Sequence, residues 1–313
     1  MGEGRSRWHV RAWGGWVLNE ARRELAGRYP TYAEWQALHP AVEVEPQPLQ
    51  LMEPDPQGLV SVAALNADIA KAKLDDPRTP RWVAKPTVAY LWARTVPCKS
   101  CRAIIPLLKT RWLCRKDGKR VLLEMKPNVA RDGVEFSVRR GVPVSVGSAK
   151  QRKAADATLG AGTMSRSGTK CPCCTTINRS DDIRYQAMRG NLGAAMTGVV
   201  VDGPRGKEYR SPTLSEVGSA RIEMSEVEGV FANIPFGIPI EPTPKAGSGA
   251  SRAFSVGGYG MLRWADLFTA RQLVALGTFV AIVRRVGPLM ANEAYPDEWR
   301  AAVWSNLALG VDR

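Results

Sequence analysis

Two short cysteine pairs constrain this chain more than any other feature of its sequence. They are Cys98-Lys-Ser-Cys101 and Cys171-Pro-Cys173-Cys174. Two thiolates separated by two residues share one tight turn and aim at one metal ion, and a second pair completes a tetrahedron. The gap between the pairs exceeds the ~15–20 residues typical of compact zinc motifs, so unrelated buried thiols remain the alternative. The pattern predicts a structural zinc site formed by Cys98, Cys101, Cys171 and Cys174.

The other cysteines and the histidines fit this site less well. Cys173 is an alternative ligand to Cys174, although a spacer of one residue suits such a turn poorly. Cys114 follows Leu113 on an expected strand and is interpreted as a packed core cysteine. His9 and His39 lie far away in the sequence and are not expected to bind metal. With four sulfur ligands no coordination position is left for a catalytic water, so the predicted role of the ion is structural.

The positive charge of the chain is concentrated around the cysteines. The sequence has 44 Lys and Arg against 30 Asp and Glu, a formal net charge of +14. Residues 94–189 hold 21 of the cations and 7 of the anions, and so carry the entire excess. Cations that serve only solubility are usually spread evenly. A concentrated positive field favours a polyanionic partner, and nucleic acid is the commonest.

The predicted nucleic-acid contacts follow from this concentration. Phosphate contacts from Lys and Arg are salt-dependent and insensitive to sequence. Two of the cations flank the first cysteine pair, where they would also offset thiolate charge, and the others surround an expected turn. The predicted contact residues are Lys99, Arg102, Lys109, Arg111, Arg115, Lys116, Lys119 and Arg120. Trp92 and Trp112 are either base-stacking side chains or core residues on strands, and the core interpretation is favoured.

Hydrophobic periodicity predicts helices in the two outer parts of the chain. Residues 8–25 carry apolar side chains at spacings of three and four, which is typical of an amphipathic helix. Capping boxes at Thr213–Glu216 and Thr269–Gln272 predict helices that extend to about Phe231 and Val286. Further expectations are a short helix at 66–73, a last helix from Pro296, and irregular connections at 39–60 and 235–250. The last helix is still apolar at Val311, which suggests a chain cut from a longer protein.

The middle of the chain is expected to be rich in β-strands. Asp117-Gly118 is a strong hairpin turn, and residues 194–201 and 207–209 form a second expected hairpin. The Gly-, Ser- and Lys-rich residues 147–170 are expected to form a mobile loop. Strand composition marks residues 87–96, 104–113, 120–125 and 135–138.

The sequence contains no recognised secretory or membrane signal. Its first residues lack an apolar segment, and the longest apolar run, Leu273–Val283, is shorter than the ~20 residues that a bilayer requires. We therefore expect a cytoplasmic protein with no membrane contact. In that reducing environment, paired cysteines bind metal more often than they form disulfides.

Catalytic motifs are mostly missing from the sequence. There is no Gly-x-Ser-x-Gly, no Walker loop and no His-Glu-x-x-His. Asn233-Ile-Pro-Phe236 is similar to the Asn/Asp-Pro-Pro-Tyr/Phe loop with which amino-methyltransferases hold a flipped base. Here it follows an expected helix and enters a proline-rich connection, rather than ending a strand. We interpret it as a chance similarity.

Several segments together resemble one family. They are Val10–Val17, Thr87–Cys98, Ile105–Trp112, Gly162–Gly168, Val201–Gly206 and Leu267–Leu276. Through them the chain resembles the central part of the large zinc-ribbon-containing adenine-specific DNA methylases of bacteria and archaea, which often lie near anti-phage defence and restriction-modification genes. The similarity extends over essentially all 313 residues.

The resemblance implies an α+β fold in which a β-rich zinc-ribbon insertion is flanked by helical segments, with an incomplete Rossmann-like methyltransferase core. The expected sections are 1–85, an N-terminal helix and connection, 86–210, the basic zinc-ribbon section, and 211–313, a helical section. The family binds S-adenosylmethionine through an Asp-Pro-Phe-x-Gly-x-Gly segment and carries a catalytic Asp-Pro-Pro-Tyr segment. Neither occurs in this sequence, so no catalytic residue is assigned.

The expected function is therefore DNA engagement by a fragment of an S-adenosylmethionine-dependent adenine-specific DNA methyltransferase. The expected ligand is Zn²⁺, with S-adenosylmethionine bound only in the complete enzyme. DNA and the missing methylase halves, encoded by neighbouring sequence, are the expected partners. A zinc-ribbon adaptor without catalytic activity and a truncated gene without function are the alternatives.

Overall fold

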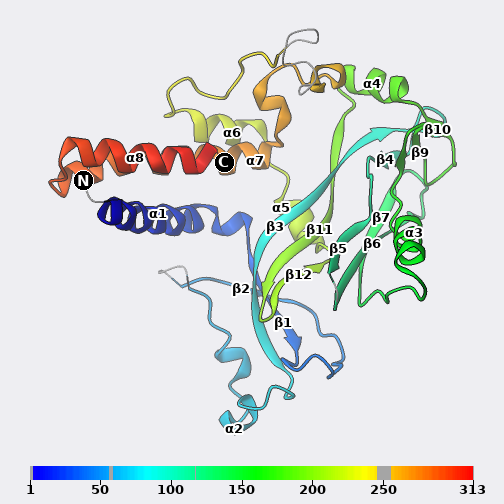
Figure 1. The fold of residues 1–313 in the computed structure, drawn as a ribbon, viewed down its shortest axis with the longest axis horizontal. Helices are drawn as coiled ribbons and strands as arrows, with labels where there is room; N and C mark the ends of the chain where they lie inside the picture. Colours follow the sequence, from blue (N-terminus) through cyan, green and yellow to red (C-terminus); the bar gives the residue numbers. More distant parts are fainter. Residues whose placement is uncertain (1–2, 56–58, 117, 245–254, 313) are drawn as a thin grey trace. The chain divides into compact units, whose positions relative to one another are not determined.

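The computed structural model describes residues 3–55, 59–116, 118–244 and 255–312. It confirms an α+β protein with antiparallel sheets and helices (Figure 1). The chain divides into two compact units. The first comprises Met1–Ala84, Gly218–Glu241 and Arg263–Arg313, and the second comprises Lys85–Val217 and Pro242–Leu262.

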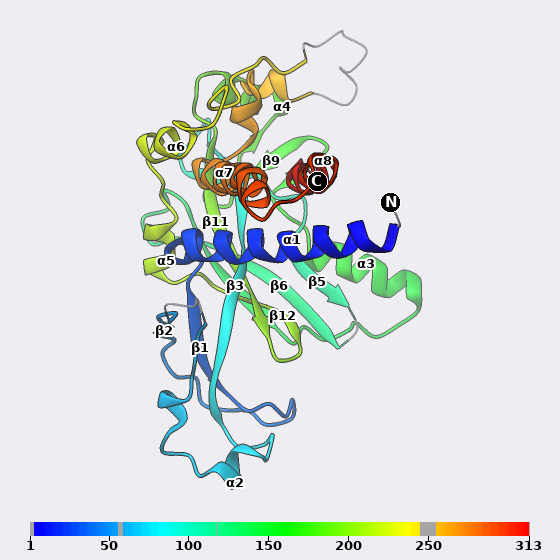
Figure 2. The ribbon, with the colours of Figure 1, turned by 90° about the vertical axis from the view of Figure 1, so that its left-hand side faces the viewer.

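The first unit is built around three long helices. They are α1 (Glu3–Leu25), α7 (Ala270–Asn292) and α8 (Asp297–Asp312). In Figure 2, α7 and α8 are seen end-on beside each other, and α1 crosses below them. Their shared core buries Val17, Ala21, Ile282, Val286, Met290, Val303 and Leu307. The predicted helix at 8–25 is thus confirmed, because its apolar stripe is the face that packs on α7 and α8.

Helix α7 begins at the predicted capping box, in which the Gln272 amide donates to Thr269 Oγ1 at 3.3 Å. The helix continues past the predicted end at Val286 to Asn292, with Pro288 inside it. Trp304 of α8 packs on Gly287 and donates its indole N–H to the Val283 carbonyl at 2.8 Å, which fixes this part of α7. In the described part of the chain, α7 is also long and apolar enough to cross a membrane, and half of its most apolar window is buried within the structure.

A second core in the first unit joins α7 to the end of α1. It contains Leu25, Leu273 and Val274, together with Val227 and Phe231 of α6 (Met224–Phe231). The remaining elements of this unit are η1 (Ala26–Arg28), β1 (Thr31–Gln36), β2 (Gln50–Met52), η2 (Ala64–Asn66), α2 (Lys71–Leu74) and η4 (Trp264–Leu267). Strands β1 and β2 pair antiparallel. The helix predicted at 66–73 forms only as the short turns η2 and α2.

The second unit contains the predicted strands, in three groups. Strand β3 (Arg81–Pro97) pairs with β4 (Ile104–Pro106) and with β11 (Gly193–Gly203), which pairs with β12 (Gly206–Arg210). A three-stranded sheet has the order β5 (Trp112–Lys116), β6 (Lys119–Pro127) and β7 (Val134–Arg140), and a smaller one contains β8 (Met164–Ser165), β9 (Gly168–Lys170) and β10 (Ile177–Asn178).

These pairings are all antiparallel. A Rossmann-like core is built mainly on parallel strands, so the sheets of the second unit do not supply one. Strand β7 packs against the β11–β12 hairpin, where the Val138 amide donates to Ser211 Oγ at 3.2 Å and Arg140 Nε donates to the Tyr209 carbonyl at 2.8 Å. The β-rich character expected for this section is therefore present, in antiparallel form.

The prediction of a mobile loop at residues 147–170 is wrong. Residues Ala149–Leu159 form helix α3, which begins at a capping box between Ser148 and Gln151, and β8 and β9 follow. Trp112 donates its indole N–H to the Asp156 carbonyl at 2.8 Å, so α3 lies against the β5–β6 sheet. The small and polar residues of this segment led to the prediction of a mobile loop. The segment is helical because Ser148 caps its N-terminus and Trp112 holds one of its faces against the sheet.

The helix predicted from Thr213 to Phe231 is divided. Its capping box is present, with the Glu216 amide donating to Thr213 Oγ1 at 3.1 Å, but α5 (Leu214–Ser219) ends at Ser219. A new helix, α6, begins after Glu223, whose amide donates to the Glu226 carboxylate at 3.2 Å. The predicted helix therefore contains a second N-terminal capping interaction, at Glu223 and Glu226, where a new helix begins. The second unit also holds α4 (Ser180–Met188) and η3 (Val256–Tyr259).

Two other predicted segments are only partly within the described residues. At the turn predicted for Asp117-Gly118, Lys116 faces Lys119, and Asp117 itself lies outside the described residues. The predicted connection at 235–250 is irregular as far as 244, and its remainder lies outside them.

Candidate metal centre

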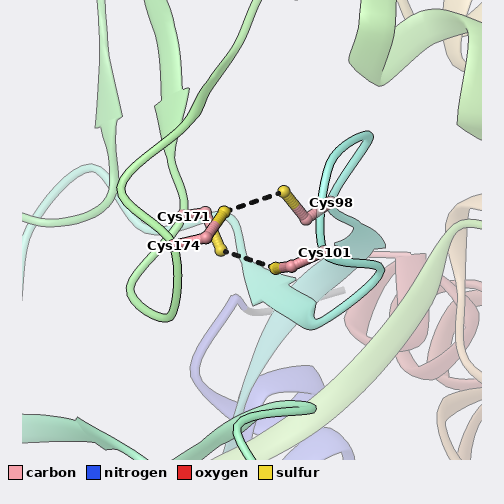
Figure 3. Close-up of side chains that lie close together, drawn as sticks. All are labelled: Cys98, Cys101, Cys171 and Cys174. Atoms are coloured by element: carbon pink, nitrogen blue, oxygen red, sulfur yellow. Dashed lines mark hydrogen bonds between the residues drawn. The ribbon is translucent and has the colours of Figure 1, made fainter.

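Four sulfur atoms from the two cysteine pairs meet in the second unit (Figure 3). The Sγ atoms of Cys98 and Cys174 are 3.7 Å apart, as are those of Cys101 and Cys171. All four sulfurs lie within 4.8 Å of one another. The two pairs are distant in the sequence, so the fold of the second unit brings them together.

The sulfur separations fit a tetrahedral ion. Zinc–sulfur bonds of about 2.3 Å at tetrahedral angles place the sulfurs about 3.8 Å apart. The two shortest separations match this value, and the widest exceeds it by about 1 Å, which small side-chain rotations remove. The four residues therefore form a cluster that could hold a metal ion such as zinc, and the predicted metal ligands are the ones that the structure assembles.

Each cysteine pair forms the turn of a β-hairpin. Cys98 and Cys101 lie between β3 and β4, where Pro97 faces Ile104. Cys171 and Cys174 lie between β9 and β10, where Lys170 faces Ile177. Backbone hydrogen bonds hold the conformation of both turns.

The two turns have the same backbone design. In the first, the Cys98 amide donates to the Ala103 carbonyl at 2.8 Å and the Arg102 amide donates to the Cys98 carbonyl at 3.1 Å. In the second, the Cys171 amide donates to the Thr176 carbonyl at 2.9 Å and the Thr175 amide donates to the Cys171 carbonyl at 3.0 Å. We call the two turns the first and second knuckle.

A buried asparagine braces the first knuckle from the second hairpin. Asn178 lies in β10, donates its side-chain amide to Cys98 Sγ at 3.6 Å, and accepts from the Lys99 amide at 2.8 Å through Oδ1. Its side chain is almost fully buried. The sequence pattern did not identify Asn178, because an isolated asparagine has no spacing signal. Its place one strand beyond the second knuckle could have indicated it.

The thiols differ in burial and in acidity. Cys98 and Cys171 are fully buried, Cys174 is half-buried and Cys101 is exposed. Burial raises the pKa of Cys171 to about 12. Hydrogen bonds from the side chain and the amide of Thr176 lower the pKa of Cys174 to about 6. Metal binding requires thiolates, so a cation at the centre would have to displace protons from the most buried sulfurs.

The two remaining cysteines lie outside the cluster. Cys173 is buried, but its sulfur faces the Gly133 carbonyl at 3.3 Å, so Cys174 and not Cys173 joins the candidate centre. Arg131 donates to the Cys173 carbonyl, which anchors the back of the second knuckle. Cys114 lies on β5 and is half-buried, so it is not the fully packed core cysteine that we expected.

The predicted nucleic-acid contacts fall into two groups. Arg120 is buried, pairs with Asp156 and stacks over the Trp112 ring at 4.6 Å. Arg111 donates to the carbonyls of Leu159 at 2.7 Å and Ala161 at 2.9 Å. These two cations hold α3 on the sheet and are not available to a ligand. The exposed or half-exposed ones are Lys99, Arg102, Lys109, Arg115, Lys116 and Lys119.

The tryptophans favour the core interpretation. Trp112 is half-buried between α3, Gly160 and Arg120, with its indole N–H satisfied. Trp92 is half-buried on β3, opposite Met196 of β11. The segment Asn233-Ile-Pro-Phe236 lies in the other unit, after α6 and not at the end of a strand. No arrangement for holding a base is seen there among the described residues.

Comparisons with known proteins do not identify a relative of this chain. No protein-family model, no curated protein and no solved structure matches it. Its function is therefore inferred from the chain's own geometry and charge and from the sequence resemblance described above.

Proposed function

We propose that this chain is a zinc-stabilised nucleic-acid-binding module, and that it supplies DNA engagement to an adenine-specific DNA methyltransferase. The observation that carries the proposal is that the four-cysteine cluster encloses, in sequence, most of the segment that holds the whole net charge of +14. Zinc would tie the β3–β4 hairpin to the β9–β10 hairpin. The strands between them would then present their cations on a fixed frame.

Zinc has a structural role in this proposal. Four thiolates fill the tetrahedron, so no site is left for a reacting water or a substrate oxygen. The free energy of metal binding would become folding free energy of the second unit. Phosphate contacts by the exposed cations would then give affinity with a strong dependence on salt.

The methyltransferase assignment is supported by the sequence resemblance alone. The cofactor and catalytic segments of that family are not in this sequence, and the strand pairings of the second unit are antiparallel. The proposal assigns S-adenosylmethionine binding and the chemistry to the neighbouring methylase halves. The second candidate is a non-catalytic zinc-ribbon adaptor.

The first test concerns the metal. Purified chain is analysed for zinc by mass spectrometry, and we expect one ion per chain. Changing Cys98, Cys101, Cys171 or Cys174 to Ser should abolish stoichiometric zinc, whereas Cys173→Ser and Cys114→Ser should retain it. Equal zinc content in all six variants would reject the centre.

The second test concerns the partner. Binding of the zinc-loaded chain to labelled duplex DNA is measured at several salt concentrations, before and after a chelator removes the metal. We expect salt-dependent binding that disappears when zinc is removed. To separate the two candidates, methyl transfer to DNA is measured for the chain mixed with the neighbouring methylase halves. Transfer that requires the chain supports the methyltransferase, and transfer unaffected by its omission supports the adaptor.

A further inference from the structure

The exposed cations of the second unit have unequal surroundings, which allows the DNA contact to be located. Around the knuckles, cations face carboxylates of α4. Lys99 pairs with Asp182 at 2.7 Å, and Arg184 pairs with Asp181 at 3.2 Å. The hydrogen bond from Lys99 holds the pKa of Asp182 below its usual range. The hollow of about 600 Å³ beside the knuckles is lined by Lys99, Arg179, Asp181 and Asp182, and so by both signs of charge.

A different arrangement exists where two hairpins end. The β5–β6 hairpin turns between Lys116 and Lys119, and the β11–β12 hairpin turns between Gly203 and Gly206. Lys119 Nζ donates to the Arg205 carbonyl at 3.4 Å, so the two tips lie side by side (Figures 1 and 2). We call the two ends together the twin tips. Their cations are Arg115, Lys116, Lys119, Arg205 and Lys207.

The cations of the twin tips are largely exposed. Arg115, Lys116, Arg205 and Lys207 are exposed, and within the described residues none of them has an ion-pair partner. Glu208 binds buried Lys85 at 2.7 Å. Asp156 binds Arg120 and also interacts electrostatically with Arg115, and Asp202 faces Lys207 across the hairpin. In the described part of the tips, Asp202 is the exposed acid that remains.

The twin tips are also narrow. The β11–β12 loop contains two residues, and Gly118 and Gly206 adopt positive φ values of 71° and 84°. The β6–β7 pairing begins at Val121, and the Val142 amide donates to the Arg120 carbonyl. In the described chain, Arg115, Lys116, Gly118 and Lys119 therefore extend beyond β7 as part of a two-stranded ribbon. A ribbon of this width fits the major groove of B-DNA.

The side chains of the twin tips favour duplex over single strands. Single-strand binding uses exposed aromatic rings on which bases stack. Trp112, at the base of the β5–β6 hairpin, is engaged by Asp156 and Arg120, and Tyr209 on β12 is half-buried. The exposed groups are cations, which bind phosphates without reading sequence.

We infer that the twin tips are the surface that binds the sugar-phosphate backbone of duplex DNA, rather than the cations beside the knuckles. This rests on the proposed function. The β5–β6 ribbon approaches the groove, and Arg205 and Lys207 contact phosphates at its edge. The metal centre acts at a distance, by holding the frame from which the ribbon extends.

The test compares two variants that each lack four positive charges of the parent chain. The tip variant carries Arg115→Gln, Lys116→Gln, Arg205→Gln and Lys207→Gln. The matched control carries Arg166→Gln, Lys170→Gln, Arg184→Gln and Arg189→Gln, all exposed cations on the knuckle side. Zinc content and the far-ultraviolet circular dichroism spectrum of both are compared with those of the parent chain, so that loss of folding is detected directly.

Affinity for a labelled duplex and for its single strands is then measured from 50 to 200 mM salt. For the tip variant we expect at least tenfold weaker duplex binding and a shallower salt dependence, by about 0.9 in log K against log salt for each phosphate that is no longer neutralised. The control should change the slope by less than about 1. The proposed location is overturned if the tip variant is folded and zinc-loaded but keeps the parent's slope of log K against log salt. It is also overturned if the control loses more duplex affinity than the tip variant. Absence of duplex binding by the zinc-loaded parent chain rejects the proposed function as well.

Discussion

Arg102 and Thr175 follow the second cysteine of each knuckle and share a left-handed backbone conformation, with φ values of 65° and 64°. The position lets the chain turn back so that the next carbonyl, from Ala103 or Thr176, accepts from the first cysteine's amide. Left-handed backbone is unfavourable by roughly 1–2 kcal/mol for residues other than glycine. The knuckles thus retain strained residues where glycine would fit.

Glycine at these two positions should therefore be tolerated or stabilising. We expect Arg102→Gly and Thr175→Gly to change the free energy of unfolding by between zero and about 1 kcal/mol in the stabilising direction, because relief of strain offsets the greater freedom of glycine in the unfolded chain. Urea unfolding of the zinc-loaded protein measures this. Ser100→Gly, in the same turn but without a positive φ, should destabilise. Stabilisation by all three variants would contradict the explanation.

Removing the buried amide of Asn178 should weaken metal binding without removing a ligand. Outer-shell partners of metal ligands typically contribute 10–100-fold to affinity, and Asn178 contacts both Cys98 Sγ and the Lys99 amide. We expect Asn178→Ala to lower zinc affinity by that factor, as measured by competition with a chromogenic chelator. Asn306→Ala, at an exposed position of α8, is the control. An unchanged affinity for Asn178→Ala would show that the contact to sulfur is incidental.

The buried pair of Arg210 and Glu216 should make stability depend on pH. Burial alone raises the pKa of Glu216. Two hydrogen bonds from Arg210, both 2.7 Å, together with the charge of Arg210 and hydrogen bonds from Thr213, outweigh burial and hold the pKa below its ordinary value of 4.5. A carboxyl with a lowered folded-state pKa stabilises above the unfolded value, and this contribution is lost as the pH falls through the folded value. The unfolding midpoint in urea should therefore decrease as the pH falls below about 4.5.

Removing Arg210 gives a direct test of this pair. Arg210→Met leaves Glu216 buried without its partner and should cost about 3–5 kcal/mol at pH 7. The double variant with Glu216→Leu should recover much of that loss, because a buried apolar pair needs no compensation. In the single variant the loss should shrink at acid pH, where Glu216 is protonated. A loss that is independent of pH would assign the effect to packing alone.

Replacement of two glycines by alanine should change the stability of the protein in opposite directions. A Cβ on Gly162 would lie 2.0 Å from the Leu108 carbonyl oxygen, which is backbone and cannot turn aside. We expect Gly162→Ala to destabilise by about 1–3 kcal/mol. At Gly218, within α5, a Cβ meets nothing within 4 Å, so Gly218→Ala should stabilise by about 0.5–1 kcal/mol. Thermal unfolding measures the unfolding temperature of both variants. Equal changes in the unfolding temperature would refute this prediction.

The sequence predicted the features that depend on local pattern. Cysteine spacing identified the four clustered sulfurs, periodicity identified α1, and a capping box identified the start of α7. Strand composition identified residues 87–96 of β3, which begins earlier, at Arg81. The prediction failed at 147–170, because α3 is fixed by contacts of Trp112 and Arg120 with Asp156 that lie far apart in sequence. For the same reason, the sequence did not distinguish Arg111 and Arg120, which form hydrogen bonds and an ion pair within the protein, from the exposed cations.

The span between the two knuckles has a consequence for how the protein is made. Cys98 and Cys101 leave the ribosome well before Cys171 and Cys174, and β5, β6, β7 and α3 are synthesised in between. A two-thiolate half-site cannot complete a tetrahedron. In the proposed zinc-bound form, capture of the ion by all four thiolates therefore waits until Cys174 has been synthesised. A chain that stalls before Cys171 carries only the first half of the candidate site.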